Sequence, residues 1–64
     1  MENLKGALRQ KHITVDMVAT LLGIHRNTAA AKINGSGEFT VSEAFYLKCH
    51  FLPEYDMAYL FQKN

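Results

Sequence analysis

The chain has 64 residues, which suits one domain with a core near the lower size limit for independent folding. Apolar residues make up 48% of it, a share that argues against a disordered chain and for a packed globule. The net charge is only +1, but residues 1–35 carry five basic and two acidic side chains, whereas the remainder carries two basic and four acidic ones. The first half is therefore suited to an anionic partner, and the second to water or another protein.

The residue content argues against an enzyme and against a bound metal or other cofactor. The single cysteine, Cys49, cannot form an internal disulfide, and the three histidines are not spaced as metal ligands. Cys49 and His50 are neighbours in a predicted helix, so their side chains point about 100° apart and do not converge as a nucleophile and a base. The chain also lacks a nucleophile elbow and a glycine-rich phosphate loop.

A membrane location is not expected either. No apolar run approaches the roughly 18 residues that a membrane span needs, and no signal-peptide pattern follows Met1. We therefore expect a soluble protein of the cytoplasm, with no membrane among its partners.

Periodicity and capping residues predict an all-α fold with five helices and no strand, over residues 2–11, 15–22, 26–33, 41–50 and 54–61. Thr14 is a good N-cap for the second helix, and Gly23 supplies the left-handed backbone that often ends one. Thr40 and Glu43 have the spacing of a capping box at the start of the fourth helix. This helix is expected to bury Val41, Ala44 and either Leu47 or Phe51, and the fifth to begin with Pro53 or Glu54 in its opening turn.

The stretch "HRNTAAAKING", residues 25–35, predicts a short helix. Its middle consists of three alanines, so it has no long side chain there. His25 takes the cap position, and the Asn34-Gly35 pair is a common helix stop. The preceding helix is joined to this one by "LGIH", with a glycine and an apolar residue, Ile24, in the turn. Two short helices in this arrangement are the signal of a helix-turn-helix, in which Ala19 is small where the helices cross.

These features together resemble those of a known family. The segment "ITVDMVATLLGIHRNTAAAKINGSGEFTVSEAF" is similar to the Cro/C1-type helix-turn-helix domain of phage and bacterial repressors. The "LLGI" turn, the "KING" helix end and the "FTVSEA" start of the fourth helix carry the likeness, which covers residues 3–61. It implies one compact five-helix, lambda-repressor-like domain over residues 1–64, a transcription regulator whose third helix enters the major groove of operator DNA.

Carried over by position, the resemblance implies a set of DNA-contacting residues: His25, Arg26, Asn27, Thr28, Ala31, Lys32 and Asn34. Side-chain chemistry agrees in part, because arginine can fork onto guanine and asparagine can pair with adenine. Without the resemblance, the solvent-facing interpretation is favoured for Arg26 and Asn27, as plain residues of a first turn. For Lys32 two roles remain open, a contact with phosphate and simple exposure to water. Ala29 is expected in the core.

The chain also departs from the family pattern, and the departures favour a second function. Val15 stands where the family usually has a glutamine that contacts a phosphate, and His25 replaces the usual Ser or Thr cap. A smooth, alanine-rich helix with little charge also suits a protein groove. The alternative is therefore an antirepressor or modulator of the same fold, which binds a partner phage repressor rather than DNA.

Aromatic residues gather in the second half of the chain, and a core this small cannot bury all of them. Exposed Tyr and Phe side chains are enriched at protein interfaces. In the family this end of the domain forms a two-fold contact, which implies a homodimer through Phe45, Tyr55 and Tyr59.

Overall fold

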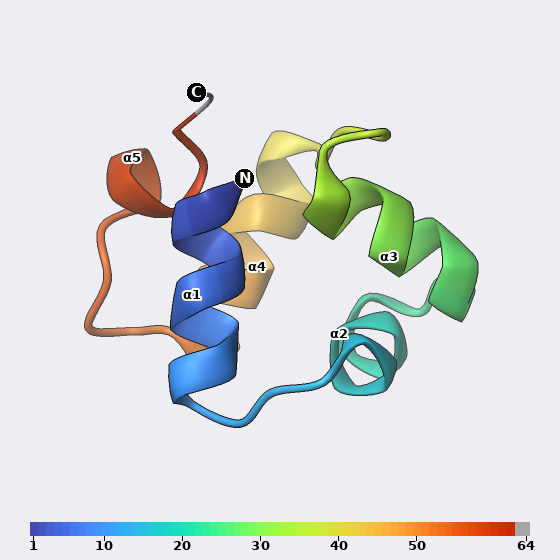
Figure 1. Ribbon diagram of the computed structural model, residues 1–64, viewed down its shortest axis with the longest axis horizontal. Coiled ribbons are helices and arrows are strands. Elements are labelled where there is room, and N and C mark those ends of the chain that lie inside the picture. The colour runs from blue at the N-terminus through green and yellow to red at the C-terminus, as the bar shows by residue number, and fades with distance from the viewer. Residues whose placement is uncertain (63–64) are drawn as a thin grey trace.

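The computed structural model describes residues 1–62, in which all regular secondary structure is helical and no strand occurs (Figure 1). Lys63, which enters the charge balance of the second half, lies outside the described residues. The helices are α1 (Glu2–Gln10), α2 (Val15–Leu22), α3 (Arg26–Asn34), α4 (Val41–Phe51) and α5 (Met57–Leu60). The predicted all-α class is confirmed, and the first four helices begin at the predicted residues.

The helix boundaries follow from local capping, as predicted. The Thr14 hydroxyl accepts the Met17 N–H at 3.2 Å at the start of α2, and Gly23 ends that helix with a left-handed φ of 67°. Gly35 ends α3 in the same way with φ 92°. At the start of α4, Thr40 and Glu43 form the predicted capping box, with both hydrogen bonds 3.0 Å long.

The core lies where the five helices meet. Its largest fully buried side chains come from α1, α2, α4, the residue after α4, and α5: Leu4, Val18, Leu47, Leu52 and Leu60. Helix α5 packs against α1 and α4, which brings the last helix to the same side of the molecule as the start of α1 (Figure 1). Helices α2 and α3 pack against each other, and α2 also packs against α4 and α3 against α1. Ala29 of α3 is fully buried, as predicted.

The prediction for the fifth helix is wrong at its start. Residues 53–55 form a turn, and α5 begins only at Met57, so that neither Pro53 nor Glu54 lies in its opening turn. The Tyr55 N–H donates to the Leu52 carbonyl at 3.1 Å, and Asp56 has an extended backbone with ψ 142°. The Tyr55 hydroxyl meanwhile donates to Gln10 Oε1 of α1 at 2.9 Å. The hydrogen bond between Tyr55 and Gln10 thus joins α1 to a turn, at residues that were expected to be helical.

Val41 is the second correction, because it is 83% exposed rather than buried. It is the first residue of α4 and lies at the rim of a surface hollow that Phe39 and Phe61 also line. The buried side of α4 begins one turn later, at Ala44, and continues through Leu47. The apolar period of α4 is therefore as predicted, but the core does not reach its first turn.

The longest helix in residues 1–62 is α4, with 11 residues, and no helix there is both long and apolar enough to cross a membrane.

Candidate nucleic-acid interface

Helices α2 and α3 form a compact unit with a connection of three residues, Gly23 to His25. The Ile24 N–H donates to the Ala19 carbonyl at 3.0 Å, which folds the connection back onto the end of α2. Ala19 is 6% exposed and Ala29 fully buried, so the helices approach through small side chains. The left-handed backbone of Gly23 allows the chain to turn directly from one helix into the next.

The buried and outward sides of α3 are clearly separated. Ala29 and Ile33 point into the core. At about 100° per residue, Asn27, Ala31 and Asn34 fall on the opposite side of the helix. Asn27 and Asn34 are exposed, and Ala31 is partly exposed between them. We call Asn27, Ala31 and Asn34 the outward stripe of α3: two amides separated by a smooth surface.

Arg26 directly precedes Asn27 in the chain, and its side chain is held from α2. Its Nε lies 2.7 Å from Asp16 Oδ1, while the two side chains remain 64% and 70% exposed. The sequence indicates only that Asp16 belongs to the first turn of α2. Its position beside Arg26 depends on how α2 and α3 cross, and no local pattern in the sequence indicates it.

His25 caps α3 through its ring. The Nδ1 atom accepts the Asn27 N–H at 3.3 Å, so a neutral ring in this arrangement carries its hydrogen on Nε2. The side chain is exposed, as is that of Thr28. The first turn of α3 therefore presents an imidazole N–H, a guanidinium, an amide and a hydroxyl in four consecutive residues.

Lys32 differs from the other predicted site residues, because it is used inside the protein. Its Nζ lies 2.7 Å from Glu43 Oε1 and 3.2 Å from the Glu38 carbonyl, and the side chain is only 15% exposed. The hydrogen bond from Lys32, aided by the Thr40 N–H, lowers the pKa of the Glu43 carboxyl. Lys32 therefore connects α3 to α4, and its charge is largely neutralised within the molecule.

Two further basic residues line a surface hollow together with the last residues of α3. This hollow of about 460 Å³ separates α1 from the start of α2 and the last turn of α3, and its lining includes Lys5, Arg9, Thr14 and Asn34. Lys5 and Arg9 were not among the residues predicted for the site. The excess of basic residues in the first half of the chain was the one signal for them, but it does not show which of these residues lie beside α3.

The predicted dimer residues lie in two places. Phe45 is 58% exposed and lines a hollow with Leu21 and Leu22 of α2. Tyr55 and Tyr59 stack with ring centroids 6.1 Å apart, next to α1, where the Tyr59 carbonyl accepts a hydrogen bond from Asn3. Tyr59 is 48% exposed, whereas Tyr55 is partly buried. A single contact through all three residues would have to extend across α4.

Comparison with known proteins finds no matching family model, curated protein or solved structure. Within residues 1–62, no group of three His, Cys, Asp or Glu side chains is placed to hold a metal ion.

Proposed function

We propose that this protein is a transcription regulator of the Cro/C1 type, which binds operator DNA by inserting α3 into the major groove. The observation that carries the proposal is the outward stripe of α3, with the exposed side chain of Arg26 at the start of the same helix. An α-helix fits the major groove of B-DNA, where base edges present distinct patterns of donors and acceptors. Because Ala31 is small, the α3 backbone can approach those edges closely. The α2–turn–α3 unit then serves as the helix-turn-helix.

The side chains along this surface suit base reading. Asn27 can donate to N7 and accept from N6 of an adenine, and Arg26 can donate to O6 and N7 of a guanine. The methyl group of Ala31 can pack against the methyl group of a thymine. In this proposal the alanines in the middle of α3 pack closely against the bases, and the polar residues at its ends form hydrogen bonds.

Phosphate contacts would come from the edges of the same surface. His25 has a ring N–H facing away from its cap, and Lys5 and Arg9 flank the hollow beside Asn34. Lys32 is left out of this set, because its ammonium group is already held by Glu43. A net charge of only +1 predicts modest affinity, which falls steeply with salt because phosphate contacts release counterions.

One α3 helix can read only a few base pairs, and each is worth about 1–3 kcal/mol of discrimination. Regulators of this type therefore pair across a two-fold axis, with the two recognition helices about one DNA turn apart. We propose that the exposed ring of Tyr59 contributes to such a pair on DNA. Phe45, on the other side of α4, offers a second apolar surface for self-association.

One observation favours the alternative function, binding of a partner repressor. Both cations of α3 have acidic partners, Asp16 for Arg26 and Glu43 for Lys32, so the helix presents little net positive charge. A protein groove accepts such a helix, whereas a phosphate backbone favours free cations.

Selection of binding sites from a pool of random duplex DNA tests the proposal, because it requires no choice of operator sequence in advance. We expect a short, preferred sequence with two-fold symmetry. Arg26→Ala and Asn27→Ala should each relax the preference at separate base pairs by about 1–3 kcal/mol. Recovery of random sequences by the wild-type protein would reject DNA reading and favour the partner-binding alternative.

A further inference from the structure

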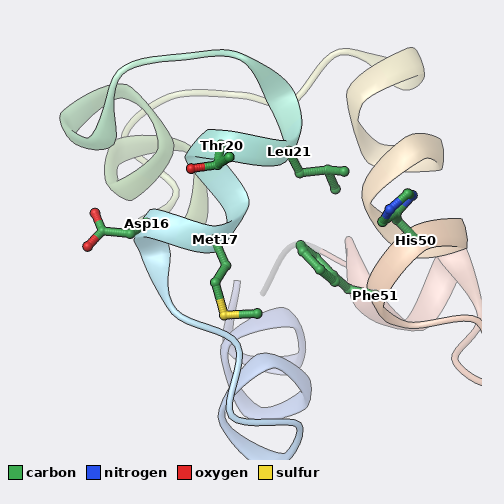
Figure 2. Close-up of a pocket in the computed structure, with 6 residues that line it drawn as sticks. All are labelled: Asp16, Met17, Thr20, Leu21, His50 and Phe51. Atoms are coloured by element: carbon green, nitrogen blue, oxygen red, sulfur yellow. The ribbon is translucent and has the colours of Figure 1, made fainter.

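The contact between Asp16 and Arg26 carries an inference about how α3 would read DNA. Asp16 lies at the edge of a surface hollow that His50 and Phe51 of α4 also line, and its carboxylate points away from these two residues (Figure 2). Its Oδ1 atom lies 2.7 Å from Nε of Arg26, the first residue of α3. The acceptor therefore holds one specific edge of the guanidinium group.

A guanidinium group can form a two-point contact in two ways, either side-on through Nε and one terminal nitrogen or end-on through both terminal nitrogens. Because Asp16 accepts from Nε, the side-on contact is occupied. The end-on fork of Nη1 and Nη2 is a different edge of the same planar group, and the contact with Asp16 does not use it. This fork has the spacing needed for O6 and N7 of a guanine.

We propose that Asp16 is a positioning residue that orients Arg26 for a guanine, and this inference rests on the DNA-binding function proposed above. Asp16 itself need not touch the base. The resulting preference is for a guanine at one position of each half-site, the position read by the first residue of α3.

The exposure of the pair argues for orientation rather than stability as its role. Both side chains are more than half exposed, and surface ion pairs of this kind contribute little to folding. Moreover, a carboxylate next to Arg26 repels DNA phosphates and partly cancels the attraction of the arginine for them. Asp16 thus disfavours a loose phosphate contact by Arg26 while leaving a directed base contact intact.

The test compares base preferences selected from random duplex DNA by the wild-type protein and by Asp16→Ala, Asp16→Asn and Arg26→Ala. Arg26→Ala identifies the base pair that Arg26 reads. At that base pair Asp16→Ala should lower the preference for guanine by about fivefold or more, as expected for loss of a directed two-point contact. Its binding to unselected DNA should stay equal or become stronger, because one acidic group has been removed from the interface.

Two variants separate orientation from charge. Asp16→Asn keeps an oxygen that can accept the Nε–H, so it should retain more of the guanine preference than Asp16→Ala does. Glu54→Ala removes an equal charge from an exposed ion pair with Lys11, which joins the end of α1 to the turn before α5. This matched control should leave the base preference unchanged.

The free protein offers a second readout. In ¹⁵N spectra the Arg26 Nε–H should exchange more slowly with water in the wild type than in Asp16→Ala. An unchanged guanine preference in Asp16→Ala, or an equal loss of binding to every sequence, overturns the positioning role while the proposed function stands. If the wild-type protein selects no sequence at all, the proposed function fails and the positioning role fails with it.

Discussion

Lys32 and Glu43 connect the last turn of α3 to the first turn of α4 through a contact of 2.7 Å between Nζ and Oε1. The same carboxylate oxygen accepts the Thr40 N–H at 3.0 Å, so one atom both caps α4 and holds α3. The Lys32 ammonium also reaches the Glu38 carbonyl and lies 6.0 Å from the centre of the Phe39 ring. The orientation of α3 is thus tied to the loop that follows it.

Glu43→Ala is expected to lower the free energy of unfolding by about 1–3 kcal/mol, because it removes the α4 cap and leaves Lys32 without its acidic partner. Urea denaturation followed by circular dichroism measures this change. Glu2→Ala is the matched control, since Glu2 is 3.8 Å from Lys5 in an exposed pair and should change stability by less than about 0.5 kcal/mol. Equal effects of the two substitutions would contradict the structural role of Glu43.

The lowered pKa of Glu43 predicts a specific acid sensitivity. Because the pKa is lower in the folded than in the unfolded state, the unfolded state binds more protons as the pH falls. The stabilisation from Glu43 is therefore complete above the ordinary glutamate pKa of 4.5 and is lost as the pH falls through the lowered folded value. In Glu43→Gln this part of the acid destabilisation should be missing, so urea titrations of the two proteins should converge toward low pH. A stability difference that stays constant with pH would exclude this linkage.

Gly23→Ala tests the turn between α2 and α3. The residue has a φ of +67° and nothing lies within 4 Å of an added Cβ, so the expected loss of about 1–2 kcal/mol arises from backbone strain alone. Gly6→Ala is the opposite case, because Gly6 lies inside α1 and also has nothing within 4 Å. It should stabilise the protein by about 0.5–1 kcal/mol. In thermal unfolding, the melting temperature should fall in Gly23→Ala and rise in Gly6→Ala.

The proposed pairing on DNA predicts that Tyr59→Ser weakens the complex with a two-fold symmetric site more than the complex with a single half-site. The ring of Tyr59 is half exposed, so the substitution should leave the fold intact. Tyr55→Ala is less informative, because it also removes the hydrogen bond to Gln10. Light scattering with each DNA measures the stoichiometry. Pairing that persists in Tyr59→Ser but is lost in Phe45→Ser would move the contact to the other side of α4.

The sequence predicted the parts of the fold that depend on neighbouring residues. Thr14, Gly23 and the Thr40–Glu43 box act within one helical turn, so the boundaries of α2 and α4 could be assigned from local patterns. The start of α5 could not be predicted, because the Tyr55 side chain pairs with Gln10, which is 45 residues away. Its hydrogen bond belongs to the packing of the turn against α1.

In the candidate site, too, features set by neighbouring residues could be predicted and long-range contacts could not. The residue types and order along α3 could be taken from the sequence, as could the burial of Ala29. The partners of its cations could not, since Asp16 and Glu43 lie on other helices and meet α3 only in the folded chain. The sequence does not decide whether Lys32 contacts phosphate or water, whereas in the structure its ammonium group lies against Glu43.

Binding of the wild-type protein to the DNA sequence it enriches most from a random pool tests the central proposal most directly. Fluorescence anisotropy at low salt should show binding that is tighter than to a scrambled duplex of equal length. The difference should shrink in both Arg26→Ala and Asn27→Ala, and affinity for either duplex should fall as salt is raised. Equal affinity for the enriched and scrambled duplexes, or an enriched site unaffected by both substitutions, would contradict base reading by α3.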